Sequence, residues 1–196
     1  MSLEPASEPM GFETSAPGIA AARPQEHTFL NQPWWAMGQV VSGHASRRVN
    51  ETATRARAGL LNLISATTIA VLLAWPQLDP VRYVGPFVLF DMLIAAATGL
   101  TPLSPTGVLG TVLTLRLRPT WKPAAPKRFA WLLGGALAAT CLTMRLLDAS
   151  PVAIAGVVGV CFCLTWLEAV LGFCVGCWMH SRIWGCEACE VTYVRR

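Results

Sequence analysis

Residues 152–175 read VAIAGVVGVCFCLTWLEAVLGFCV, an apolar run that contains one charged residue, Glu168. A helix needs about 20 mostly apolar residues to cross the hydrocarbon core of a bilayer, so this stretch is long enough to span a membrane. Its apolar residues are continuous rather than alternating, which favours a helix over a strand. The stretch therefore predicts a transmembrane helix.

Three upstream stretches have the same character. They are residues 58–75 (AGLLNLISATTIAVLLAW), 81–100 (VRYVGPFVLFDMLIAAATGL) and 129–147 (FAWLLGGALAATCLTMRLL). One such run could be the core helix of a soluble protein, but four in one short chain indicate membrane spans. Short turns at 76–80 (PQLDP) and 148–151 (DASP) would make neighbouring helices antiparallel. The sequence thus predicts an all-α integral membrane protein whose four transmembrane helices form two hairpins.

The composition of the whole chain agrees with this prediction. Hydrophobic residues make up 54% of the 196 residues and charged residues 13%, and the mean hydropathy is +0.48. A typical soluble domain is about 25% charged. These values exclude a disordered chain and an ordinary soluble enzyme. The formal net charge of +4 is too small to imply a polyanionic partner, so no nucleic acid is expected.

The basic residues are distributed unevenly around the predicted spans. Of the fifteen lysines and arginines, all but Arg82 and Arg145 lie before the first span, in the long loop between the hairpins, or after the fourth span. Cytoplasmic segments carry an excess of Lys and Arg, so both termini and the long loop are expected in the cytoplasm. The chain is thus predicted to be a multi-pass protein of the bacterial cytoplasmic (inner) membrane, with the lipid bilayer as its first partner.

The chain divides into three parts by composition. Residues 1–48 are rich in Pro, Ala, Ser and Glu without an apolar period, which predicts a disordered cytoplasmic tail. Residues 49–182 are expected to form the four-helix membrane domain, and residues 183–196 a short cytoplasmic tail that contains cysteines. Within the long loop, residues 108–117 are apolar but too short to span. They are expected to lie in the interface or to pack under the bundle.

Four of the seven cysteines form two C-x-x-C pairs, Cys174 with Cys177 and Cys186 with Cys189. On the cytoplasmic side thiols are normally reduced, so stable structural disulfides are not expected. The other three are expected to be small packing residues inside helices: Cys141, Cys161 and Cys163.

The first interpretation of the pairs is a redox dithiol. Cys174 and Cys177 are three residues apart, and such positions face each other on a helix, so the two thiols could close a disulfide. If the pair ends the fourth helix, the helix dipole disfavours a thiolate there. His180 and Arg182, which follow closely, could offset that effect.

Two other interpretations remain open. All four cysteines could hold zinc or iron, although the gap between the pairs is shorter than in a zinc ribbon: Cys174, Cys177, Cys186 and Cys189. Alternatively, Gly172 and Gly176 could permit close helix packing, with the cysteines merely filling space.

Ionisable residues inside a span are costly and are therefore functional candidates. Asp91 lies near the middle of the second span, and Glu168 lies six residues before Cys174. At about 1.5 Å of rise per residue the two acids lie at different depths, so they are not expected to pair with each other. We expect Arg145, near the outer end of the third span, to pair with Asp91. Glu168 is expected just beneath the cysteine pair, where it could tune or relay a proton to a thiol.

Several segments together resemble a bacterial membrane family known as domain of unknown function 4395. They are 49–50 (VN), Asp91, 103–105 (LSP), 126–130 (PKRFA), 167–169 (LEA) and 172–177 (GFCVGC). The resemblance covers about residues 49–182. It implies a small four-helix membrane protein and marks Glu168, Cys174 and Cys177 as family positions, without an established activity. The first tail and the second cysteine pair lie outside it.

The leading functional hypothesis is thiol-redox chemistry or sulfur handling at the cytoplasmic membrane face. Cys174 and Cys177 would be the working dithiol, with Glu168 and His180 as proton partners. The expected partner is a cytoplasmic thioredoxin-like or sulfur-carrier protein.

Two alternatives belong to other functional classes. The chain could be a structural or accessory subunit of a membrane complex, with Trp34 and Trp35 of the tail making contacts. It could also be a small transporter in which Asp91 and Glu168 line a polar path.

Overall fold

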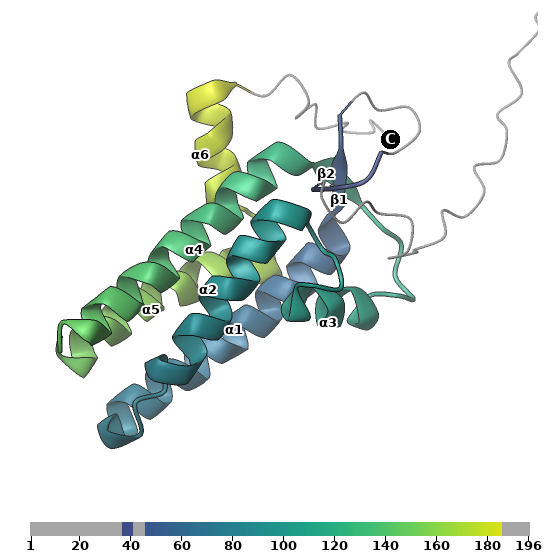
Figure 1. Cartoon of the computed structure of the whole chain (residues 1–196). Coiled ribbons are helices and arrows are strands. Elements are labelled where there is room, and N and C mark those ends of the chain that lie inside the picture. The colour runs from purple at the N-terminus through teal and green to yellow at the C-terminus, as the bar shows by residue number, and fades with distance from the viewer. Residues whose placement is uncertain (1–36, 41–45, 186–196) are drawn as a thin grey trace, which may run out of the picture.

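The computed structural model describes residues 37–40 and 46–185, which form a helical bundle with a small sheet at one end (Figure 1). The elements are β1 (Arg48–Asn50), α1 (Glu51–Ala74), a 3₁₀ turn (Pro76–Leu78), α2 (Val81–Thr98), α3 (Pro105–Leu113), β2 (Trp121–Pro123), α4 (Ala124–Leu146), α5 (Pro151–Trp166), a π-helical turn η3 (Leu167–Leu171) and α6 (Val175–Trp184).

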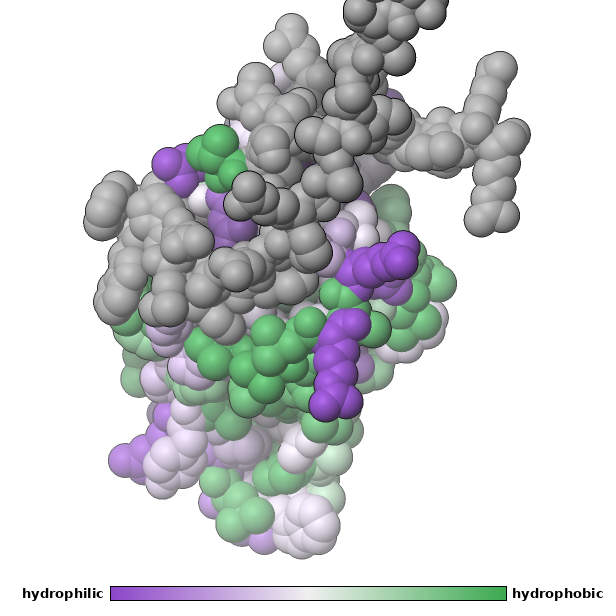
Figure 2. Space-filling view, turned by 90° about the vertical axis from the view of Figure 1, so that its right-hand side faces the viewer, coloured by the Kyte–Doolittle hydropathy of each residue, from purple (hydrophilic) through white to green (hydrophobic). Residues whose placement is uncertain are grey.

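Four helical segments are long and apolar enough to cross a membrane, as the sequence predicted. They are Glu51–Ala74, Val81–Thr98, Ala124–Leu146 and Pro151–Leu171. Apolar side chains also cover much of their outer surface, and Figure 2 shows a broad hydrophobic area on one face. Examples with more than two-fifths of their surface exposed are Leu63, Phe90, Leu132 and Val160. An apolar outer surface of this kind suits contact with lipid tails.

Two of the long helices begin earlier than their apolar runs. Helix α1 begins at Glu51, about two turns before residue 58, because the side chain of Asn50 caps it by accepting hydrogen bonds from the amides of Thr52 and Ala53. Helix α4 begins at Ala124, ahead of residue 129. The added turns carry polar side chains that find partners inside the protein, and these partners form much of the site described below.

Short connections join α1 to α2 and α4 to α5, as expected for two hairpins. The tightest packing, however, pairs helices from different hairpins, α1 with α5 and α2 with α4. One cluster of buried apolar residues, around Met92 and Trp131, lies toward the sheet. A second, around Leu72 and Ile154, lies toward the turns.

The sheet and α3 tie the long loop to the start of α1. Strand β1 pairs antiparallel with β2, with Val49 opposite Lys122, so the chain enters α1 beside the start of α4. Helix α3 packs on α1 so closely that a Cβ on Gly110 would lie 2.7 Å from the carbonyl oxygen of Ala53. The apolar piece of the loop therefore packs against the bundle. The all-α prediction did not include this sheet.

Candidate functional site

The fourth span ends in a break that the sequence analysis did not predict. Gly172 adopts a left-handed conformation with φ of 66°, which ends the π-helical turn η3 and lets the chain restart as α6. The guanidinium of Arg55 donates hydrogen bonds to the carbonyl oxygens of Ala169, at 3.1 Å, and Val170, at 3.0 Å. Arg55 thus satisfies carbonyl groups that the break leaves without helical partners.

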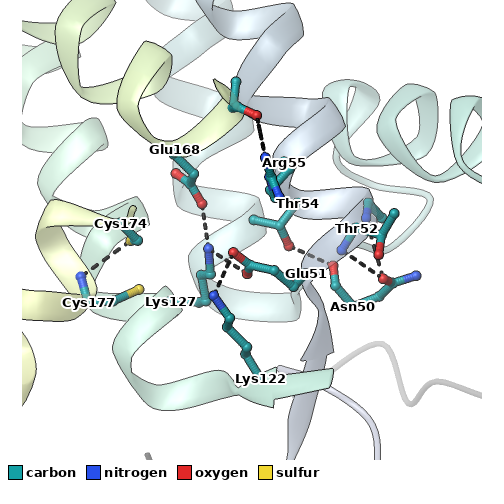
Figure 3. Close-up of polar contacts among 12 residues, drawn as sticks. Asn50, Glu51, Thr52, Thr54, Arg55, Lys122, Lys127, Glu168, Cys174 and Cys177 are labelled. Atoms are coloured by element: carbon teal, nitrogen blue, oxygen red, sulfur yellow. Dashed lines mark hydrogen bonds and ion pairs between the residues drawn. The ribbon is translucent and has the colours of Figure 1, made fainter. Parts of the chain in front are cut away.

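The break places Cys174 at the N-terminus of a helix. Cys174 is the N-cap of α6, and its sulfur accepts a hydrogen bond from the backbone amide of Cys177 at 3.3 Å (Figure 3). The expectation that the pair ends the fourth helix was wrong, because Gly172 ends that helix first. The expected effect of the helix dipole on Cys174 is reversed as well, because the N-terminal end of a helix favours a thiolate.

Helix α6 is held on α4 by close backbone contact. A Cβ on Gly176 would lie 2.6 Å from Cα of Ala130, so only glycine fits between the two helices at this point. The first turn of α6, which contains both cysteines, is therefore fixed against α4 rather than free in solvent.

The two thiols differ in their affinity for a proton. A hydrogen bond from the thiol of Cys177 lowers the pKa of Cys174 below its ordinary value. Burial and the charge of Glu168 oppose this effect, whereas the charge of Lys127 and the amide of Cys177 add to it. The same hydrogen bond, together with burial, raises the pKa of Cys177. Cys174 is thus the group that ionises first, and Cys177 keeps its proton.

A buried lysine lies beside the cysteine pair. The ammonium of Lys127 is 2.8 Å from Oε2 of Glu51 and 2.5 Å from Oε1 of Glu168, and its side chain is 2% exposed. Lys122 reaches the other oxygen of Glu51 at 3.2 Å. Figure 3 shows this group next to Cys174, with contributions from the starts of α1 and α4 and from η3. Glu168 therefore lies near the pair, held in place by Lys127.

Sequence reasoning missed Lys127 and Glu51 as site residues. In the sequence, Lys127 looks like one of the basic residues that set membrane orientation. A usable signal was present, because Lys127 belongs to the PKRFA segment that carries the family resemblance. Glu51 directly follows the VN segment of the same resemblance.

Asp91 pairs with Arg57 rather than with Arg145. The Arg57 guanidinium is 2.7 Å from Oδ2 of Asp91, whose side chain is fully buried. Ser104 donates to Oδ1 at 2.8 Å, and the amide and hydroxyl of Thr106 also donate to the carboxylate. The expected pairing was wrong because α1 starts early enough to bring Arg57 inside the bundle. These contacts join α1, α2 and the start of α3.

Arg145 lies at the opposite end of the bundle from the sheet. Its Nε is 2.5 Å from Oδ2 of Asp79, and NH1 is 3.1 Å from Oδ1 of Asp148. These contacts bring together the α1–α2 turn and the α4–α5 turn, one from each hairpin. Arg145 is therefore part of that end of the molecule and not of the candidate site.

His180 lies in an aromatic cluster on α6. Its ring centroid is 5.9 Å from that of Phe129 and 5.0 Å from that of Trp184. Within the described part of the chain, Nδ1 of His180 is buried and has no hydrogen-bond partner. Its role as a proton partner stays a prediction.

The four-cysteine metal hypothesis depends on residues outside the described ranges. Cys186 and Cys189 both lie there, as do Trp34 and Trp35. Among residues 37–40 and 46–185, no three His, Cys, Asp or Glu side chains are grouped so that they could hold a metal ion. The four-cysteine metal site therefore stays a prediction.

Comparison with known proteins gives a family but no relative with an assigned role. No curated protein and no solved structure matches the chain. The family described as a domain of unknown function (DUF4395) matches residues 49–184, a range that includes every side chain of the site built above. The chain therefore belongs to the DUF4395 family.

Proposed function

We propose that this protein carries out thiol–disulfide exchange at the cytoplasmic face of the bacterial inner membrane, with Cys174 as the reactive sulfur. The observation that carries the proposal is the position of Cys174 as N-cap of α6, with Cys177 in the first turn of the same helix. That arrangement provides a sulfur stabilised as a thiolate and a second thiol placed to form a disulfide with it.

The direction of exchange follows from the stability of the reduced form. Interactions that favour the Cys174 thiolate stabilise the dithiol relative to the disulfide, which makes the disulfide an oxidant. The protein therefore accepts electrons from a dithiol partner, a cytoplasmic thioredoxin-like or sulfur-carrier protein.

The exchange is balanced in two steps. A thiolate of the partner attacks the Cys174 sulfur, the Cys174–Cys177 bond breaks, and the sulfur of Cys177 leaves and takes up a proton. The second thiol of the partner then loses its proton and attacks the mixed disulfide, which releases the Cys174 thiolate. The partner becomes a disulfide, and two electrons rest on the Cys174 and Cys177 thiols.

Glu168 is placed to handle the proton of this exchange. Its carboxylate is anchored by Lys127 at 2.5 Å and affects the ionisation of both cysteines. We assign Glu168 as the group that exchanges a proton with the Cys177 sulfur, with His180 as a further candidate.

The transporter alternative finds little support in the geometry. It needs Asp91 and Glu168 to line one polar path, but Asp91 is fully buried among donors from α1 and from the segment that starts α3. The accessory-subunit alternative rests on a tail that lies outside the described residues.

The test is the trapping of a mixed disulfide. The oxidised full-length protein in detergent is mixed with a reduced thioredoxin that lacks its resolving cysteine, and the adduct is mapped by mass spectrometry. We expect the adduct on Cys174, and its loss in Cys174→Ser. Cys163→Ser, which removes an exposed cysteine within α5, serves as the matched control and should leave the adduct intact. Absence of an adduct, or an adduct on Cys163 alone, would contradict the proposal.

A further inference from the structure

Helix α3 turns its larger apolar side chains away from the protein. Leu109, Val112 and Leu113 are 52%, 50% and 64% exposed, and their spacing places them on one face of the helix. The residues buried on the opposite face are small or polar: Thr106, Gly107, Gly110 and Thr114. A helix at the boundary between a protein and water has the reverse pattern, with its larger apolar residues inside. The outer face of α3 therefore suits an apolar environment.

Close contacts fix the orientation of α3. A Cβ on Gly110 would lie 2.7 Å from the carbonyl oxygen of Ala53 and 2.9 Å from the amide nitrogen of Arg57, so only glycine fits there. At the start of the helix, the amide and the hydroxyl of Thr106 donate to the Asp91 carboxylate. The helix cannot turn its apolar outer face inward without losing these contacts.

Basic side chains border the exposed face. The chain leaves α3 through Leu115, Arg116, Leu117 and Arg118, all of them exposed. No Asp or Glu occurs between residues 92 and 147. Within the described residues, neither of these two guanidinium groups forms an ion pair. Figure 2 views the side of the molecule on which α3 lies in Figure 1, and it shows hydrophobic side chains gathered there next to strongly hydrophilic ones.

Lipid is the environment that matches both features. Helix α3 packs on the first turns of α1, which is long and apolar enough to span a membrane, so its outer face lies beside the surface expected to contact lipid. Leucine side chains there suit the acyl chains, and the long arginine side chains can extend to the phosphate groups. A second copy of the chain on this face would bring Arg116 and Arg118 of both copies together without a described acid to offset their charge.

We propose that α3 and the segment that follows it bind anionic phospholipid, with Leu109, Val112 and Leu113 among the acyl chains. Arg116 and Arg118 hold the phosphate. Each arginine near a membrane surface contributes about a fivefold preference for an anionic headgroup. Lipid binding at this surface is independent of the thiol exchange proposed above.

Fluorescence quenching by brominated lipid tests the position of this face. The full-length chain without native cysteines carries a bimane label at Leu113→Cys. It is placed in nanodiscs that contain phosphatidylglycerol and phosphatidylcholine, one of them brominated on its acyl chains. Leu132→Cys on α4, where the native residue is 46% exposed, is the control for lipid contact, and Gln77→Cys, at an exposed position in the α1–α2 turn, is the control for water. We expect strong quenching at Leu113→Cys and Leu132→Cys and weak quenching at Gln77→Cys.

The headgroup preference at Leu113→Cys tests the two arginines. We expect brominated phosphatidylglycerol to quench this label better than brominated phosphatidylcholine at equal mole fraction. Arg116→Gln with Arg118→Gln should lower the relative binding constant about fivefold for each arginine removed, and Arg116→Lys with Arg118→Lys should retain most of it. Arg82→Gln removes an exposed arginine at the opposite end of the bundle, and as the matched control it should leave the preference unchanged.

The same arginine variants are also made in the chain with its native cysteines. Native mass spectrometry of the phosphatidylglycerol bound to them gives the comparison even if the cysteine-free chain fails to fold.

Three results would overturn the proposal. The first is quenching at Leu113→Cys as weak as at Gln77→Cys, which would place the face in water or against another protein. The second is disulfide cross-linking of two copies through Leu113→Cys, which would assign the face to a second copy. The third is a preference for phosphatidylglycerol that is absent, or that survives Arg116→Gln with Arg118→Gln. None of these results bears on the proposed function, which the mixed-disulfide experiment tests separately.

Discussion

At the cysteine pair, a few contacts set the chemistry of one sulfur. Cys174 accepts hydrogen bonds from the amide and the thiol of Cys177, and the positive charge of Lys127 acts on it through a buried environment. The same cysteine at a helix C-terminus would face carbonyl oxygens and the negative end of the dipole. Cys174 lies at a helix N-terminus instead because Gly172, two residues upstream, ends one helix and lets the next one begin.

The ionisation of Cys174 can be measured through its reactivity. Because its pKa is lowered, the thiolate is fully formed above that value and is lost as the pH falls through it. The rate of iodoacetamide alkylation at Cys174, followed by peptide mass spectrometry, should therefore reach half its maximum at a pH below that of an ordinary thiol. Cys177→Ala removes the donor thiol and should move the midpoint upward, whereas Cys177→Ser keeps a donor and should move it less. A midpoint at or above the ordinary thiol value in the unaltered protein would contradict this prediction.

Lys127 stabilises two buried carboxylates at once. Lys127→Met would leave Glu51 and Glu168 in the interior without their shared cation, and removal of one partner from a buried ion pair costs about 3–5 kcal/mol. Thermal unfolding in detergent should show a large loss of stability, partly recovered when Glu51→Gln and Glu168→Gln are added. Lys122→Met is the control, because its side chain is 47% exposed and its contribution should be about 0–1 kcal/mol. An equal loss of stability in the two lysine variants would show that Lys127 contributes no more to stability than the exposed Lys122.

At the scale of elements, the site depends on the junction of η3 and α6. Arg55 binds the last carbonyls of η3, Gly172 reverses the backbone, and Gly176 seats α6 on Ala130. This sequence of contacts turns one apolar run into a span followed by a separate helix. The junction is therefore the structural cause of the Cys174 environment.

Gly172→Ala tests that junction. An alanine at φ of 66° costs about 1–2 kcal/mol, and its Cβ would lie 3.3 Å from Cζ of Arg55. We expect lower thermal stability together with a rise in the alkylation midpoint of Cys174. Gly159→Ala is the control, because a Cβ there meets nothing within 4 Å and alanine favours the helix. If Gly172→Ala left the alkylation midpoint unchanged, the reactivity of Cys174 would not depend on the break at Gly172.

The sequence predicted the four long helices because each contains a continuous apolar run of spanning length. It did not predict where α1 and α4 begin, since Glu51, Arg57 and Lys127 look like residues of a solvated loop. They are helical and buried because each finds an opposite charge on another helix, and a pairing of that kind depends on how helices are rotated against one another. Depth along one helix, which suggested Arg145 for Asp91, carries no information on that rotation.

The candidate site was predicted only in part, again because the sequence does not show which distant residues meet in the fold. The C-x-x-C spacing and the acid six residues before it brought Cys174, Cys177 and Glu168 together from local sequence alone. The break at Gly172 was hidden, because glycine within an apolar run also fits close helix packing. Lys127 and Glu51 come from distant parts of the chain, and only the β1–β2 pairing explains why they meet.

At the scale of the whole molecule, the two ends of the bundle differ in charge and in content. The end with the sheet carries the cysteine pair and most of the basic residues, and the opposite end carries the Arg145, Asp79 and Asp148 contacts. The positive-inside rule would place the sheet end in the cytoplasm. The proposed dithiol partner then approaches the Cys174 sulfur from the cytoplasmic side.

Labelling from each side of the membrane tests this orientation. Single cysteines are introduced into a variant without native cysteines, at Leu147 near the α4–α5 turn and at Leu117 in the long loop; both positions are exposed. A membrane-impermeant maleimide should label Leu147→Cys in intact spheroplasts and Leu117→Cys only in inverted vesicles. The reverse pattern would place the cysteine pair outside the cytoplasm and would exclude a cytoplasmic partner.

The redox state of the Cys174 and Cys177 pair in native membranes tests the central claim most directly. Membranes are quenched with acid, free thiols are alkylated, disulfides are reduced, and a second alkylating reagent marks the released thiols for mass spectrometry. We predict that the pair is found both as a dithiol and as an intramolecular disulfide, and that reduced thioredoxin converts the disulfide to the dithiol. A pair that stays fully thiol in native membranes and after treatment with DTNB would contradict the account.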